Sequence, residues 1–203
     1  CSKKEIFNKN TEVKYGKKLA DNVLYNYPHI LKGCSVKDLE RKIKSAGVAD
    51  VPAIIVSAGP SLDKNIRTLK QAEGKAFIIG VDSALKALVR EQIQFQVAVS
   101  VDPRKHLTVF EDERLSDIPY VLSCYSIPEI AERNHNKIFY ASSPGFDSFE
   151  ELIKRRTGSD LGELKTGGSV ATDAFWLALK MGFKQIILIG QDLGFTGGRG
   201  HVS

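Results

Sequence analysis

The chain has 203 residues, of which 42% are hydrophobic and 26% are charged, and its formal net charge is +5 at pH 7. This length and composition are typical of a soluble protein with one main hydrophobic core, and no segment approaches the ~18 apolar residues of a membrane span. The modest positive charge favours an anionic partner such as a nucleotide, but the chain has neither zinc-finger spacing nor a basic stretch with interleaved aromatic residues, so we expect no nucleic-acid binding.

Residues 1–50 are polar and helix-prone. Leu19, Val23 and Ile30 recur at helical spacing, and a second helix is expected at Val36–Ser45, before Gly47. We expect this part to form a helical N-terminal extension that packs on the main domain, which occupies residues 51–203.

From residue 51 onward, short apolar runs alternate with amphipathic segments. Strands are expected at 52–57, 76–81, 95–101, 119–124, 137–141 and 185–190. Helices are expected at 61–72, 83–92, 104–115, 147–156 and 169–181. Because the strand runs are apolar throughout, both faces of the sheet should be buried. The alternation predicts an α/β fold of the Rossmann-like kind, with a doubly wound, mostly parallel sheet and helices on both faces.

Three scattered cysteines without a C-x-x-C spacing favour reduced thiols. Since no charged-then-apolar leader is visible either, we expect a cytoplasmic protein. The chain begins at Cys1 without a methionine and ends at Ser203 within a glycine-rich stretch. We therefore expect a domain that is truncated at its C-terminus, with residues beyond Ser203 completing the site.

Polar residues and glycines gather where the strands are expected to end, at the edge where open parallel sheets bind ligands. The first strand runs into Ser57-Ala58-Gly59-Pro60-Ser61, where glycine permits close backbone approach and the next helix presents N–H groups. The other strand ends and the last helix start carry Asp82, Asp102-Pro103, Gly190-Gln191-Asp192 and Thr166-Gly167-Gly168-Ser169. Taken together, these groups predict a pocket.

Each of these residues also has a purely structural interpretation. Ser61, Asp82, Asp102 and Ser169 are good helix N-caps, and Gly59-Pro60 fits a tight turn. The sequence contains no G-x-G-x-x-G after the first strand, no G-x-x-x-x-G-K-[ST] and no G-x-S-x-G, which disfavours nicotinamide, P-loop and hydrolase chemistry.

Two histidines fall near the same edge. His201, in the loop beyond the last strand, suits an acid or base but equally suits a solvated position. For His106, at a helix start, solvent exposure is the default.

The motifs SAGPSLD (57–63), GVDSAL (80–85), VSVDP (99–103), GGSVA (167–171) and LIGQDL (188–193) with FTGG (195–198) resemble the domain shared by motility accessory factors (Maf) and MptE-like pterin diphosphokinases. The resemblance covers roughly residues 50–203. More distantly, the Gly-Pro-Ser-Leu turn and the late glycine loop are similar to those of bacterial CMP-sialic-acid sialyltransferases, which implies a sialyltransferase-like fold.

These resemblances imply a nucleotide site. The residues implied are Ser57, Ala58, Gly59, Pro60, Ser61, Asp82, Thr166, Gly167, Gly168, Ser169 and Gln191. The candidate catalytic residues are Asp102, Asp192 and His201.

Two transfer reactions and one binding role follow from the resemblance. A Maf-like glycosyltransferase would move a CMP-activated nonulosonic, sialic-acid-like sugar onto Ser or Thr of flagellin without an obligatory metal. An MptE-like kinase would pass diphosphate from ATP to 6-hydroxymethyl-dihydropterin, with Mg²⁺ held by Asp82, Asp102 and Asp192. The acidic edge favours the kinase, whereas the N-terminal helices and the Phe-Thr-Gly-Gly segment favour the motility proteins, which we prefer. The third alternative is a nucleotide-binding module without catalysis.

Overall fold

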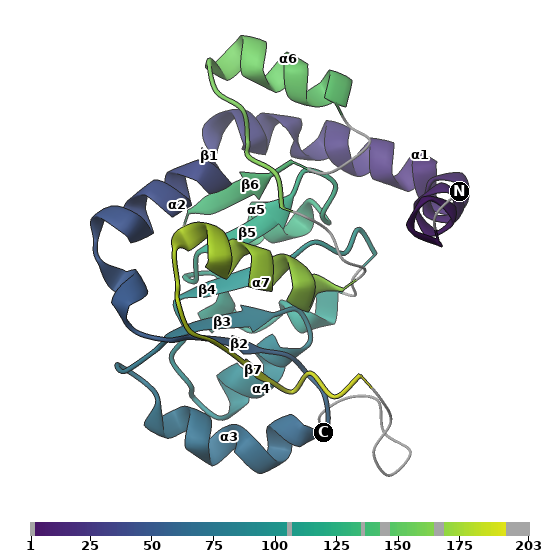
Figure 1. The fold of residues 1–203 in the computed structure, drawn as a ribbon. Coiled ribbons are helices and arrows are strands. Elements are labelled where there is room, and N and C mark those ends of the chain that lie inside the picture. Colours follow the sequence, from purple (N-terminus) through teal and green to yellow (C-terminus); the bar gives the residue numbers. More distant parts are fainter. Residues whose placement is uncertain (1–2, 105–106, 135–136, 143–146, 165–168, 194–203) are drawn as a thin grey trace.

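The computed structural model describes residues 3–104, 107–134, 137–142, 147–164 and 169–193 (Figure 1). Its strands are β1 (Cys34–Ser35), β2 (Ala53–Val56), β3 (Phe77–Val81), β4 (Val97–Ser100), β5 (Tyr120–Ser123), β6 (Ile138–Ala141) and β7 (Ile186–Ile189). Its α-helices are α1 (Lys3–Lys32), α2 (Val36–Ser45), α3 (Ser61–Gln71), α4 (Ala84–Arg90), α5 (Glu129–Arg133), α6 (Asp147–Thr157) and α7 (Val170–Met181). Three short 3₁₀ turns are η1 (Val48–Asp50), η2 (Leu107–Val109) and η3 (Glu113–Leu115).

The seven strands form one sheet in the order β1-β6-β5-β4-β3-β2-β7, and every neighbouring pair is parallel. From β2 the chain adds strands in one direction as far as β6. It then returns through α7 and places β7 on the opposite side of β2. The winding direction therefore changes at β2, and such a switch point is where open α/β sheets bind their ligands.

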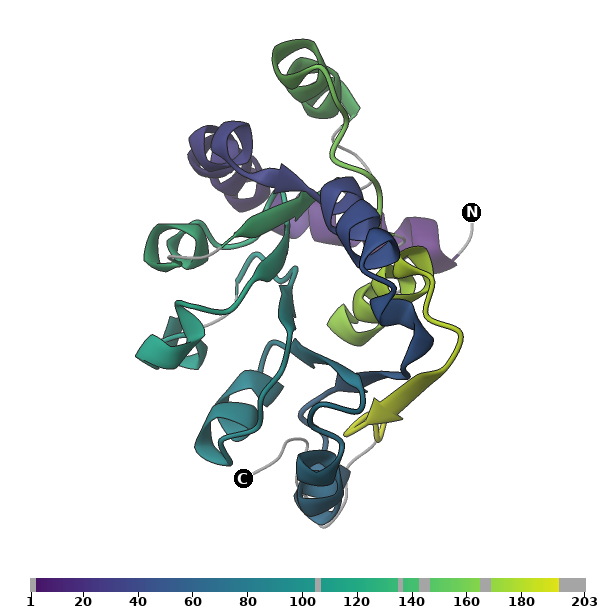
Figure 2. The ribbon, with the colours of Figure 1, turned by 90° about the vertical axis from the view of Figure 1, so that its left-hand side faces the viewer.

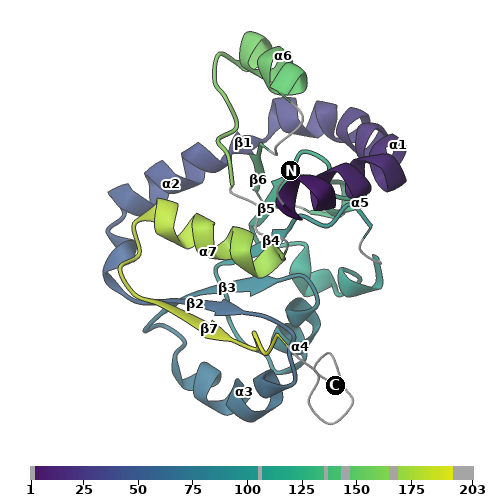
Figure 3. The ribbon, with the colours of Figure 1, turned by 45° about the vertical axis from the view of Figure 1, so that its right-hand side comes forward.

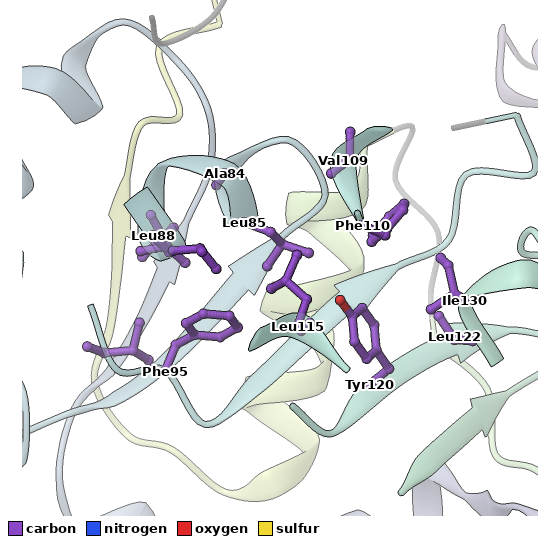
Figure 4. Packing of buried hydrophobic residues seen from close by; sticks show 14 of the residues in the cluster. Ala84, Leu85, Leu88, Phe95, Val109, Phe110, Leu115, Tyr120, Leu122 and Ile130 are labelled. Carbon is purple, nitrogen blue, oxygen red and sulfur yellow. The ribbon is translucent and has the colours of Figure 1, made fainter. Parts of the chain in front are cut away.

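Helices cover both faces of the sheet, as Figure 2 shows from the side. On one face, α2 and α7 pack on the side chains of Ala53, Ile55 and Ile79. On the other face, α1, α3, α4 and α5 enclose a cluster that includes Ile54, Val56 and Ile78. In Figure 4, Leu85 and Leu88 of α4 meet Phe95, Leu115 and Tyr120 in this second cluster. Burial of adjacent strand residues toward opposite faces explains the continuous apolar runs of β2 to β5. The expected burial is wrong for the edge strand β7, where Ile187 and Leu188 are exposed because no described strand or helix covers them there.

These observations confirm the predicted doubly wound α/β fold and helical N-terminal region. All six expected strands are present, shortened at their ends. The expected helix at 104–115 is wrong, because the described part of this segment forms only η2 and η3. Asp112 adopts an extended conformation there, and its carboxylate accepts the N–H of Arg114, so the chain restarts instead of continuing a helix.

One strand and one α-helix were not expected from the sequence. The short strand β1 pairs with β6 and extends the sheet at one edge, and α5 follows β5. No helix in the described ranges is both long and apolar enough to cross a membrane.

The long helix α1 lies against the loops that follow β4 and β5. The Asn22 side-chain amide donates hydrogen bonds to the carbonyls of Pro103 and Tyr125, at 3.1 and 2.9 Å. One turn further, the fully buried Asn26 donates to the carbonyls of Cys124 and Ser126, at 3.1 and 2.7 Å. Because residues four apart share one face of a helix, the two amides act as one clamp.

Candidate functional site

A cavity of about 460 Å³ opens at the carboxyl ends of β2, β3 and β7, beside the N-terminus of α7. It lies at the switch point of the sheet, and Figure 3 shows α7 running beside β3 and β2. The lining residues come from four segments: Ser57, Ala58 and Gly59; Val81, Asp82 and Ser83; Ser169, Val170 and Ala171; Gly190, Gln191, Asp192 and Leu193. The structure thus brings most of the described candidate nucleotide residues to one place, while Pro60 and Ser61 lie outside the lining.

The loops after β2 and β7 touch through their backbones. The Ser57 N–H donates to the carbonyl of Ile189, and the Gly59 N–H donates to the carbonyl of Gly190, both at 2.8 Å. A Cβ atom at Gly59 would lie 2.0 Å from Oδ2 of Asp192 and 2.4 Å from the Gly190 carbonyl oxygen. Gly190 also has a positive φ of 71°, which favours glycine. The absence of a side chain at Gly59 therefore lets the loop after β7 pack against the loop after β2.

The N-terminus of α3 binds a carboxylate of the protein itself. Oδ2 of Asp192 accepts hydrogen bonds from the backbone N–H of Ser61 at 3.1 Å and from the Ser61 hydroxyl at 3.0 Å. The expectation that Ser61 is an N-cap is wrong, because the helix already includes it and the capping position belongs to Pro60. An anion at a helix N-terminus is stabilising, and Asp192 takes that place here.

Two polar side chains form the buried part of the cavity wall. Asp82 is 5% exposed and has a φ of 36°, an uncommon conformation for a residue other than glycine. Ser57 is 7% exposed, and its hydroxyl has no hydrogen-bond partner in the described part of the chain. It follows Ala53 and Ile55 in the strand alternation, so it faces the α7 side of the sheet. A buried hydroxyl without a partner is costly, which suits one that a ligand completes.

The first turn of α7 and its N-cap form part of the cavity wall. Ser169 is its N-cap as expected, since its hydroxyl oxygen accepts the N–H of Thr172 at 3.3 Å. Val170 and Ala171 follow as the first helical residues and line the cavity. Backbone N–H groups in a first helical turn have no acceptor inside the helix, so they are available to an anion.

A carboxyl group that the sequence analysis did not select lies in the same turn. Asp173 is 2% exposed, and its Oδ1 atom has no hydrogen-bond partner among the described residues. Burial, and secondarily the charge of Asp82, raises the pKa of Asp173 to about 7. A charged residue in the otherwise apolar segment VATDAFWLALKM was the available signal.

Asp102 lies apart from the cavity lining. Its carboxylate accepts the N–H of Arg104 at 2.9 Å and lies 3.7 Å from Nε of the same residue. The arginine head group stacks over the ring of Tyr15, 4.2 Å from its centroid, which ties this loop to α1.

The donor set for Mg²⁺ is therefore incomplete in the described ranges. Asp82 and Asp192 line the cavity, but Asp102 does not, and these ranges contain no group of three His, Cys, Asp or Glu residues arranged to hold a metal ion. Thr166, Gly167 and Gly168 of the late loop, together with His106 and His201, lie outside the described residues.

The described wall is rich in hydrogen-bond acceptors. Its charged side chains are Asp82 and Asp192, and the described lining includes no Lys, Arg or His. Hydroxyls or amino groups of a ligand would pair with these oxygens, while an anionic group would meet the N–H groups of Val170 and Ala171.

Comparison with known proteins supports the family suggested by the motifs. The family model described as "6-hydroxymethylpterin diphosphokinase MptE-like" matches residues 21–198. A solved structure of a Maf glycosyltransferase from Magnetospirillum magneticum AMB-1 has a TM-score of 0.62 and 24% sequence identity over 72% of this chain. The match covers 23% of that glycosyltransferase chain, and at this identity it shows a shared fold. No curated protein matches the chain.

Proposed function

Because the chain belongs to the MptE-like family of 6-hydroxymethylpterin diphosphokinase domains, we propose that its cavity binds a nucleotide and serves a transferase. The activity that we favour is glycosyl transfer, in which a CMP-activated nonulosonic sugar passes to a Ser or Thr hydroxyl, with flagellin as the acceptor protein. The fold likeness to a Maf glycosyltransferase supports this choice.

The observation that carries the proposal is the position of Ser57. Its hydroxyl is buried without a partner in the described chain, and the residue lines the same cavity as the first turn of α7. A phosphate held by the N–H groups of Val170 and Ala171 would also accept a hydrogen bond from this hydroxyl. Such contacts would stabilise the negative charge that develops on the CMP phosphate as the glycosidic bond breaks.

The hydrogen-bond acceptors of the cavity wall suit the sugar and the ribose of this ligand. A nonulosonic sugar and a ribose are both rich in hydroxyl groups, and carboxylate oxygens such as those of Asp82 accept hydrogen bonds from them. Under this proposal no metal is required, because hydrogen bonds from the helix terminus support the leaving group.

The second candidate is the diphosphokinase named in the family description. The cavity favours it in one respect, since Asp82 and Asp192 supply hard oxygen atoms of the kind that bind Mg²⁺. The metal would neutralise and orient the phosphates of ATP. A third Mg²⁺ ligand would have to come from water, from substrate or from outside the described residues.

A thermal-shift titration with CMP and with ATP, each with and without Mg²⁺, tests these alternatives, because a ligand that binds the folded state raises the melting temperature. We expect CMP to stabilise the protein without metal. Stabilisation by Mg·ATP alone would favour the diphosphokinase, and no response to either nucleotide would contradict both candidates.

A further inference from the structure

Asp192 follows β7 but bonds to the start of α3, which lies 131 positions away in the chain. Both of its contacts, from the N–H and the hydroxyl of Ser61, reach a single oxygen atom, Oδ2. The carboxylate thus receives two donors and lies at the positive end of the helix dipole. This arrangement is that of a stable internal cap.

The surrounding backbone leaves no room for a larger anion at this point. The space beside Gly59 is filled by Oδ2 of Asp192 and by the carbonyl oxygen of Gly190. The backbone hydrogen bond from Gly59 to Gly190 fixes the two loops at the same place. A phosphate could reach the N-terminus of α3 only after the β7 loop had moved away.

We propose that Asp192 is a positioning residue, whose carboxylate locks the loop after β7 onto the N-terminus of α3 and so holds two walls of the cavity together. The proposal rests on the proposed function of the same cavity and gives Asp192 this role in place of the catalytic role expected from the sequence. The neighbouring Gln191 and Leu193 line the cavity on either side of the lock.

One consequence concerns where the ligand's anionic group binds. With the end of α3 occupied by Asp192, the N-terminus of the twelve-residue helix α7, whose residues Val170 and Ala171 line the cavity, remains as the anion site. The Gly-Pro turn after β2 would then hold Asp192 in place, and the phosphate of the nucleotide would bind at the first turn of α7.

Amide hydrogen exchange tests the lock without any ligand. In Asp192→Ala, peptides covering 57–61 and 189–193 should both exchange faster, because the two loops lose their shared contact. Ser61→Ala, which keeps the backbone donor, should give a smaller increase in the same two segments. Lys64→Gln removes an exposed charge from the same turn of α3 and serves as the control, with no change expected.

CMP affinity, measured at a temperature where every variant is folded, gives the second readout. We expect Asp192→Ala to weaken binding about tenfold and Ser61→Ala about threefold, with the double variant no weaker than Asp192→Ala because both changes remove one contact. Ser61→Thr, which keeps the hydroxyl, should restore most of the affinity lost in Ser61→Ala.

Several results would overturn the proposal. Unchanged exchange in both segments of Asp192→Ala would exclude the lock, whether or not CMP binds. Tighter CMP binding by Asp192→Ala would mean that the carboxylate competes with the ligand. Weaker binding with no effect of Ser61→Ala, or loss of Mg²⁺-dependent ATP binding in Asp192→Ala, would mean that Asp192 contacts ligand or metal. If wild-type protein binds neither nucleotide, the proposed function fails, while the exchange data still decide the lock.

Discussion

Asp173 in the first turn of α7 lies within electrostatic reach of Asp82, which follows β3 on the floor of the cavity. Desolvation is the main reason that the pKa of Asp173 rises to about 7, and the negative charge of Asp82 adds to it. Asp82 lines a cavity whose described lining has no basic side chain, and Asp173 is buried behind that lining, in the same turn of α7 as Val170 and Ala171. Burial, and to a smaller extent repulsion from Asp82, therefore favours a neutral Asp173 below pH 7.

Asp173→Asn should therefore flatten the dependence of stability on pH. The pKa of Asp173 is higher in the folded protein than the ordinary 3.8, so the folded state binds the proton more tightly and loses stability as the pH rises from about 4 through 7. As the pH rises from 5 to 8, we expect the free energy of unfolding of the wild type to fall by ~2 kcal/mol because of this group, which lowers the melting temperature by roughly 5 °C. The variant should not show this decrease. The measurement is the melting temperature of both proteins at each pH. If the two melting temperatures change with pH in the same way, Asp173 does not titrate in this range.

Gly59→Ala should destabilise the fold by ~3 kcal/mol, because the new Cβ would collide with Asp192 and with the Gly190 carbonyl. Gly16→Ala is the matched control, since nothing lies within 4 Å of a Cβ built there in α1. This control should stabilise the protein by ~0.5–1 kcal/mol through helix propensity. Urea unfolding measures both changes, and equal effects of the two substitutions would refute the collision.

Apolar strand runs and turn residues were sufficient to predict the six longer strands, the burial of β2 to β5 and most of the helices. The helix expected at 104–115 is wrong although the apolar residues of this segment suit one, because the hydrogen bond that the Arg114 N–H donates to the Asp112 carboxylate favours a turn. Strand β1 has only two residues, too few for any period, and forms through pairing with β6. Local sequence cannot reveal such long-range pairing.

The site was predictable in its location but less so in its contacts. Residues at strand ends identified the cavity, because parallel topology brings those ends to one edge. The bond between Ser61 and Asp192 joins residues far apart in the chain, and the clamp of Asn22 and Asn26 depends on where α1 docks. Contacts of this kind follow from tertiary packing and leave no periodic signal in the sequence.

Asn26→Ala should destabilise the protein by ~2–3 kcal/mol, because it leaves the buried carbonyls of Cys124 and Ser126 without their donor. Asn65→Ala is the control, since Asn65 also donates to a backbone carbonyl, that of Ser61, but from an exposed position on α3. Loss of the Asn65 hydrogen bond should lower the free energy of unfolding by less than ~0.5 kcal/mol. Chemical denaturation of both variants checks the difference, and a similar cost at the two sites would argue against the α1 clamp.

Ser57→Ala tests whether the Ser57 hydroxyl binds a ligand or stabilises the fold. Because the Ser57 hydroxyl is buried without a hydrogen-bond partner in the described chain, its removal should leave the stability of the free protein unchanged or raise it by up to ~1 kcal/mol. The rise in melting temperature produced by CMP should nevertheless shrink, since the phosphate loses a donor and binding weakens by about fivefold. Thermal-shift titrations of wild type and variant with CMP measure both quantities. A clear loss of stability in the free variant, with an unchanged response to CMP, would mean that the hydroxyl is structural and that the nucleotide binds elsewhere.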